Sequence, residues 1–290
     1  MKEVAQLYDE SFLSLRYPSL HLGYDAQHTL LSNLGRHGGR VDAFEQMLVD
    51  QSSHCVAIDG HVIACTSEKN DLSAFGYKAK KLGSAQINWM TAYDVRTKQP
   101  LVSQMFNGAD PDKSSVQVLF SRFQFKNTLF LVDRGFNTTS NKRLMSAEGN
   151  SYIMPMIVGR NDYNYVYEHL NFDPNCSFVY DKDGYSSLVS YQEFVLNGQR
   201  CIAYHDSTRA CAERKTYMEH LRDGHKGYTE DGLRASEKDF GLFLLDTSDF
   251  DKPPEEIFCD YKSRWGIETF YEYIDTHMDF NALYQQDYCC

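Results

Sequence analysis

The chain has 290 residues and a formal net charge of −11, and its composition is 42% hydrophobic and 24% charged. That length can bury a sizeable core in one large domain or two smaller ones. No apolar run approaches membrane-spanning length and the start lacks the apolar region of a signal peptide, so no membrane partner is expected. The eight cysteines form no Cys-x-x-Cys pair, which favours reduced thiols in the cytoplasm. The acidic balance argues against a nucleic-acid binder, whose surface is normally basic.

Residues 1–50 are predicted to form an N-terminal helical region, because their apolar side chains recur at helical spacing. A glycine-containing break at 35–39 separates two such stretches, and nothing specific to a helix-turn-helix motif accompanies it. We therefore expect helices that pack against the main domain.

Residues 51–158 are predicted to form the first part of an α/β core. An apolar run that begins at His54 predicts a buried strand that ends at Asp59, and a second run closes in the same way on Asp133. Alternation in the first strand places Asp59 on the face opposite Val56. The other strands of this part are expected at residues 85–93, 101–106 and 152–157. Its helices are expected at residues 114–123 and 140–147.

From residue 159 the pattern changes to short, aromatic-rich segments. They are separated by Asp183-Gly184 and Asn197-Gly198, which are signals for tight hairpin turns. We therefore expect an inserted, mostly β subdomain over residues 159–239. Residues 240–290 are predicted to return to the core with a buried strand and then a helix.

The last helix carries the residues on which the functional hypothesis depends. Tyr261, Arg264, Glu268 and Asp275 recur along one side of it. They lie beside a predicted apolar stripe made of Ile267, Phe270, Ile274 and Met278. A carboxylate at the edge of a buried stripe, one turn after an arginine, indicates a functional site. The alternative is an exposed ion pair worth roughly 0.3–0.5 kcal/mol.

Carboxylates at two strand ends and on a packed helix can converge at one edge of a sheet. Asp59, Asp133 and Glu268 would then need a cation between them, although aspartates at strand ends are also common as turn or cap residues. Oxygen ligands without histidine or cysteine suit Mg²⁺ or Mn²⁺. Two such ions about 4 Å apart would stabilise the attacking and leaving oxygens of a phosphoryl displacement. Arg264 would bind a phosphate and Tyr261 would donate a hydrogen bond to the DNA backbone.

Three sequence blocks resemble the DDE transposases of bacterial insertion sequences, in particular the group whose last motif is named YREK. The blocks are residues 86–94 (QINWMTAYD) with 108–114 (GADPDKS), residues 129–136 (LFLVDRGF), and the spacing Tyr261-x-x-Arg264-x-x-x-Glu268. The resemblance implies an RNase H-like mixed sheet flanked by helices, with a β subdomain inserted before the last acid. It also implies that Asp59, Asp133 and Glu268 are catalytic and bind two Mg²⁺ or Mn²⁺ ions.

The same resemblance implies the reaction and its partners. Metal-activated water, and then a 3′-hydroxyl, would attack phosphodiesters at the transposon ends, in cut-and-paste DNA transposition. The partners would be DNA, at the transposon ends and the target, and a second copy of the chain in a synaptic complex.

Two features depart from the family pattern. Asp275 stands where the family has a lysine, so an acid replaces a phosphate contact. The chain also stops at residues 284–290, where a helix bundle is expected to continue, which predicts truncation at the C-terminus. The acidic balance would then describe a chain without its basic DNA-binding parts. A local basic edge beside Asp59 is still predicted from Lys78, Lys80, Lys81 and Arg96.

Three alternatives stay open on sequence grounds. The first is a metal-dependent nuclease of the same fold, and the second is a truncated, non-catalytic transposase remnant. The third, a hydrolase with a serine or cysteine nucleophile, is disfavoured because no Gly-x-Ser-x-Gly turn occurs and the ten histidines form no motif.

Overall fold

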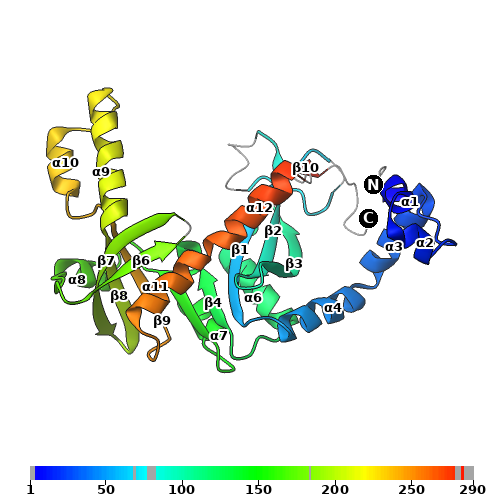
Figure 1. The fold of residues 1–290 in the computed structure, drawn as a ribbon, viewed down its shortest axis with the longest axis horizontal. Helices are drawn as coiled ribbons and strands as arrows, with labels where there is room; N and C mark the ends of the chain where they lie inside the picture. Colours follow the sequence, from blue (N-terminus) through cyan, green and yellow to red (C-terminus); the bar gives the residue numbers. More distant parts are fainter. Residues whose placement is uncertain (1–3, 68–69, 77–82, 183, 278–281, 284–290) are drawn as a thin grey trace.

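The computed structural model describes residues 4–67, 70–76, 83–182, 184–277 and 282–283. Its strands form one ten-stranded mixed sheet, in the order β3-β2-β1-β4-β5-β9-β8-β7-β6, with β10 paired to β1 (Figure 1). The strands are β1 (Cys55–Cys65), β2 (Ala85–Asp94), β3 (Gln99–Asn107), β4 (Leu129–Val132), β5 (Ser151–Pro155), β6 (Ser177–Lys182), β7 (Tyr185–Leu196), β8 (Gln199–Asp206), β9 (Leu242–Thr247) and β10 (Ala282–Leu283).

Helices lie on both sides of this sheet. They are α1 (Val4–Asp9), α2 (Phe12–Arg16), α3 (Tyr24–Arg36), α4 (Gly38–Asp50), α6 (Asp112–Arg122), α7 (Thr139–Met145), α8 (Asn161–Glu168), α9 (Ser207–Arg222), α10 (Glu230–Ser236), α11 (Pro254–Ser263) and α12 (Trp265–His277), with the 3-10 helix η1 (Arg134–Phe136). Within the described ranges, no helix combines the length and the apolar character needed to cross a lipid bilayer. The cysteines of these ranges are free thiols, as predicted.

The centre of the sheet is covered on both faces, which explains its apolar strands. All four residues of β4 are buried. Val56 and Ile58 point to the face covered by α4, α6 and α7. Cys55 and Ala57 point to the opposite face, covered by α11 and α12. The alternation predicted for the first strand is therefore confirmed, and it places Asp59 beneath α11 and α12.

The first strand is longer than predicted. It continues past Asp59 to Cys65, because β2 pairs with it from Val56 to the end. The parallel neighbour on its other side, β4, ends at Val132. The prediction that Asp59 is the last residue of its strand is thus wrong, and Asp59 instead lies where β1 loses one of its two neighbours.

The inserted segment extends the same sheet. Strand β8 pairs with β9 along its length, and β9 pairs with β5 of the core, so the sheet is continuous across the predicted boundary. The predicted hairpin between β7 and β8 is present, with Asn197 and Gly198 at φ 52° and 76°. The segment also carries α8, α9 and α10 beside its strands, so helix contributes more to it than predicted.

The last helix is interrupted at Arg264. There the N–H of Arg264 donates to the carbonyl of Tyr261 at 3.1 Å, and the N–H of Ile267 donates to Arg264 at 3.1 Å, which is the tighter three-residue pattern. The predicted helix is therefore present as α11 and α12, which meet at this residue. Just beyond it, a Cβ on Gly266 would lie 3.4 Å from the Tyr93 ring, an ordinary contact distance, so α12 packs directly on β2.

Of the N-terminal helices, α4 is the one whose contacts attach it to the core in the described part of the chain. Val49 of α4 is buried, and the Glu45 carboxylate accepts the Ser103 N–H at 2.9 Å. By contrast, α1, α2 and α3 bury no residue. Within the described ranges, the predicted packing against the main domain is therefore seen for α4, whereas α1, α2 and α3 bury no side chain. The predictions for Lys78, Lys80, Lys81, Met278 and residues 284–290 concern positions outside the described residues.

Candidate functional site

The parallel pairing of β1 with β4 places two aspartates side by side. The paired positions end at Ile58 with Val132, so the next residues on the two strands are Asp59 and Asp133. The Asp133 residue is exposed at the strand end, and the Asp59 side chain is 23% exposed within β1. Asp133 precedes η1 and yet makes no side-chain cap hydrogen bond, which speaks against the cap alternative.

Arg264 brings Glu268 to this pair. Its Nη1 lies 3.9 Å from Asp59 Oδ2, and its Nη2 lies 2.6 Å from Glu268 Oε1. The arginine side chain is only 12% exposed, so the two residues do not form the exposed surface pair that was the alternative. Among the described residues, its Nε is buried without a hydrogen-bond partner, so one donor of the guanidinium is still free.

The pKa of Asp59 is raised from 3.8 to about 6. Burial is the main cause, and the negative charges of Asp133 and Glu268 add to it. The N–H of Gly60, which donates to Asp59 Oδ1 at 2.8 Å, and the guanidinium of Arg264 oppose the rise. The three carboxylates therefore interact through their charges, and an added cation would stabilise them.

This donor set suits a hard divalent cation in its chemistry, because it offers carboxylate oxygens only. Within the described ranges, however, no three histidine, cysteine or acidic side chains are placed so that they could share one ion. The Arg264 guanidinium is the cation between Asp59 and Glu268 here. The three acids therefore interact through their charges, and Arg264 lies between Asp59 and Glu268. Their role as metal ligands stays a prediction.

Two tyrosines belong to the site. The pKa of Tyr261 is raised to about 12, first by burial and also by Asp133 and Glu268, so its phenol keeps its proton at neutral pH. Tyr271 was not predicted, and its hydroxyl donates to the backbone carbonyl of Asp59 at 2.8 Å. This bond fixes α12 against the strand that carries the first acid.

A fourth acid also went unrecognised. A Cβ built on Gly60 would lie 2.7 Å from Asp112 Oδ1, so the missing side chain makes room for that carboxylate beside β1. Asp112 is the first residue of α6, two residues before the predicted start of that helix. The glycine directly after Asp59 was the signal that could have shown a close approach.

Asp275 has a partner of its own. Its carboxylate lies 3.1 Å from His61 Nε2, and the His61 ring stacks on Tyr271 with centroids 4.6 Å apart. These contacts tie the C-terminal half of α12 to β1 beyond Asp59. The departure from the family lysine therefore replaces a predicted phosphate contact with an attachment inside the protein.

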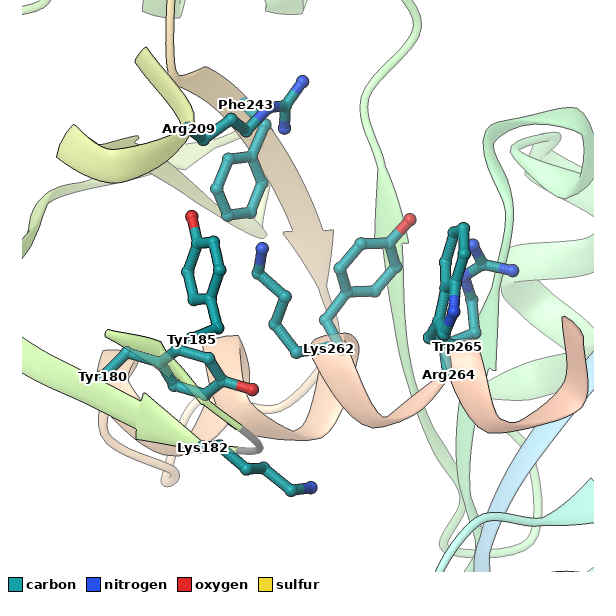
Figure 2. A pocket seen from close by; sticks show the side chains of 9 residues that line it. Tyr180, Lys182, Tyr185, Arg209, Phe243, Lys262, Arg264 and Trp265 are labelled. Atoms are coloured by element: carbon teal, nitrogen blue, oxygen red, sulfur yellow. The ribbon is translucent and has the colours of Figure 1, made fainter. Parts of the chain in front are cut away.

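A cavity of about 650 Å³ opens beside the acids, between α11 and the inserted strands. Figure 2 shows Tyr180 and Tyr185 of the inserted segment on one side of Lys262, with Arg264 and Trp265 further along. The lining residues are Tyr180, Lys182, Tyr185, Arg209, Phe243, Tyr261, Lys262, Arg264 and Trp265. Cations and aromatic rings therefore gather locally in a chain that is acidic overall.

Of the four residues predicted to form a basic edge beside Asp59, Arg96 lies in the described part of the chain, and its charge is paired. Arg96 forms an ion pair with the buried carboxylate of Asp260, which also accepts from Lys252 at 2.6 Å. Its guanidinium is thus engaged in holding α11 to the turn after β2. Within the described ranges, the positively charged side chains near the acids are those that line the cavity.

Replacing Asp59 with asparagine is expected to stabilise the metal-free protein at about pH 8. The folded-state pKa of about 6 exceeds the ordinary value of 3.8, so ionising this carboxyl in the folded state is unfavourable. The gain, on the order of 1–3 kcal/mol, should shrink as the pH falls from 6 towards 3.8 and be mostly lost near pH 4, because below 3.8 both states bind the proton. Urea unfolding at the two pH values measures it. Asp133→Asn is the control and should gain little, and an Asp59→Asn protein less stable than the parent at about pH 8 would contradict the expectation.

Comparisons with known proteins identify a family and a fold for this chain. A family model described as Transposase DDE domain matches residues 50–284. No curated protein matches the chain. Among solved structures the chain is similar to the "Cryo-EM structure of piggyBac transposase synaptic complex with hairpin DNA (SNHP)", with 10% identity and a TM-score of 0.50. The match covers 91% of this chain and 49% of that one, so the chain spans about half the length of that solved protein. The likeness shows the fold, which is the predicted RNase H-like mixed sheet flanked by helices.

Proposed function

Because the chain belongs to the transposase DDE domain family, we propose that it cuts and joins DNA strands by metal-dependent phosphoryl transfer, the chemistry of cut-and-paste transposition. The observation that supports this most directly is the placement of Asp59 beside Asp133 with Glu268 joined to Asp59 through Arg264. Membership of the YREK group of bacterial insertion sequences is part of the proposal, since Tyr261, Arg264 and Glu268 match its first three letters.

The three acids would hold the metal ions. The family generally uses divalent metals, and we assign two Mg²⁺ or Mn²⁺ ions to Asp59, Asp133 and Glu268. When bound, such ions polarise a phosphate oxygen and make a water or hydroxyl a stronger nucleophile. The raised pKa of Asp59, about 6, means that this carboxyl is ionised and ready for a cation above that pH.

Arg264 and Tyr261 would bind the DNA backbone. The Arg264 side chain lines the cavity beside the acids, so its guanidinium can donate hydrogen bonds to a phosphate oxygen there. The phenol of Tyr261 stays protonated at neutral pH because its pKa is about 12, and it can therefore donate a hydrogen bond. Together they would orient a phosphodiester against the acids.

The neighbouring cavity would accept the DNA strand that leads to the acids. Lys182 supplies positive charge there, Arg209 and Lys262 add cations that are paired with Glu213 and Asp206, and aromatic rings offer surfaces on which bases stack. Lys262 also lies 3.5 Å from Asp206 and its ammonium is within 5.3 Å of the Tyr185 ring, so its position is fixed by the protein. A chain with a net charge of −11 would therefore still offer DNA a local group of cations at this cavity.

We further propose that two copies of the chain act together on paired transposon ends in the cytoplasm. The solved protein of similar fold is titled as a synaptic complex with hairpin DNA. For this chain, the proposed DNA chemistry rests on its own acids and cations. The pairing of two copies is proposed by analogy with that complex.

The test uses a supercoiled donor plasmid that carries the coding sequence of this chain with its own flanking DNA. With Mg²⁺ or Mn²⁺, the proposal predicts cleavage at the flanks and joining of the released 3′ ends to a target plasmid, and no reaction with EDTA. Cleavage without joining would instead identify a metal-dependent nuclease of the same fold. Metal binding by titration calorimetry with neither cleavage nor joining would identify a non-catalytic remnant.

A further inference from the structure

The N-terminal arm, defined as residues 4–41, exposes an unusual amount of apolar surface. Twelve of the 25 large apolar side chains that are exposed in the described ranges belong to it, although it has only 38 residues. The most exposed are Leu7, Phe12, Leu15 and Tyr24, at 62–76%. Figure 1 shows α1, α2 and α3 lying apart from the sheet and connected to it through α4. Scattered exposed leucines are ordinary, whereas such a concentration marks an interaction surface.

The helices of this arm are too short to be stable alone. α1 and α2 have six and five residues and α3 has 13, and none of them buries a side chain. Helices of this length are marginal in water unless an apolar face is covered. A partner that covers the arm would supply the missing stabilisation.

Charge points to the kind of partner. The arm has three acidic residues (Asp9, Glu10 and Asp25) and three basic ones (Arg16, Arg36 and Arg40), so it is neutral within a chain of net charge −11. A duplex or an anionic membrane surface would be met by an excess of cations, which the arm lacks. Two arms can approach each other without repulsion, while the acidic remainder of each chain stays apart.

From these observations we infer that the arm is a self-association surface, on which the arm of a second copy of this chain packs its apolar side chains against Leu7, Phe12, Leu15 and Tyr24. The interface holds two chains together before any DNA is bound. In each chain, α4 connects the arm to the sheet, because Val49 is buried in the core and Glu45 accepts the Ser103 N–H of β3.

The test is the molar mass of the full chain in solution without DNA, by light scattering after size-exclusion chromatography. The parent is expected at about twice the chain mass of 33.4 kDa. The double variant Phe12→Ser with Leu15→Ser should dissociate, with a dimer dissociation constant raised by roughly tenfold or more. The matched control is Phe75→Ser with Val195→Ser, whose side chains are 79% and 65% exposed outside the arm, and it should remain dimeric.

Several results would overturn the inference. They are a parent that is monomeric up to about 100 μM, an arm variant as dimeric as the parent, and a control that dissociates like the arm variant. A monomeric parent that sediments with anionic vesicles would assign the arm to a lipid surface instead. Circular dichroism checks that both variants stay folded, as expected because none of the four side chains is packed. The test contains no DNA, so its failure leaves the proposed activity in place.

Discussion

Replacing Asp133 with asparagine is expected to leave the protein folded and to lower metal-dependent DNA cleavage by about a thousandfold or more. The residue is exposed at the end of β4, and its side chain caps no helix, so the fold does not depend on it. Its carboxylate lies beside Asp59 through the β1–β4 register, and an amide cannot supply the negative charge that would bind a cation there.

The measurement is the rate of donor-plasmid cleavage in Mg²⁺, with unfolding curves to show an unchanged fold. Asp251→Asn serves as the control, because Asp251 is also exposed and lies in the loop before α11, away from the acids. The control should cleave like the parent. An Asp133→Asn protein that cleaves at the parent rate would remove Asp133 from the site.

Replacing Glu268 with glutamine is expected to reduce cleavage by about a hundredfold or more, and much further than Asp275→Asn. Both acids lie on α12 and both are about 30% exposed, so they form a matched pair. Glutamine can still accept from Arg264 Nη2, so the fold near α12 should persist while the charge is lost. Asparagine at 275 can keep the hydrogen bond to His61 and should change the rate by less than about tenfold.

Cleavage rates of the two variants, measured side by side over a range of Mg²⁺ concentrations, decide this point. If Glu268 is a ligand, its variant should also need more metal. Equal losses in the two variants would show that the third acid has been misplaced on this helix.

The register of the core was predictable because apolar runs and their ends follow simple rules. The run before Asp133 is short and bounded by a turn, which identifies a buried strand and its last residue. Strict alternation in β1 likewise fixed which face carries Asp59. The spacing from Tyr261 to Glu268 fixed which side chains share one side of the last helix, even though the backbone tightens at Arg264.

Other parts of the site could not be predicted because they depend on contacts between distant segments. The length of β1 depends on its pairing with β2, which continues past Asp59 to Cys65. The residues next to Asp59 in the sequence do not indicate this pairing. The approach of Asp112 to Gly60 and the bond from Tyr271 to Asp59 join segments that lie 52 and 212 residues apart. The partner of Asp275 was missed for the same reason.

The unbroken sheet has a mechanical consequence. β9 pairs with β5 on one side and with β8 on the other, and Asp246 of β9 binds Lys142 of α7 and the Tyr152 hydroxyl of β5. Detaching the inserted strands would break backbone ladders and expose that buried carboxylate, so the two halves should unfold as one cooperative unit. The insertion therefore behaves as a rigid extension of the catalytic strands. A load applied to it by a bound partner would be carried along the sheet towards Asp133 rather than absorbed by a hinge.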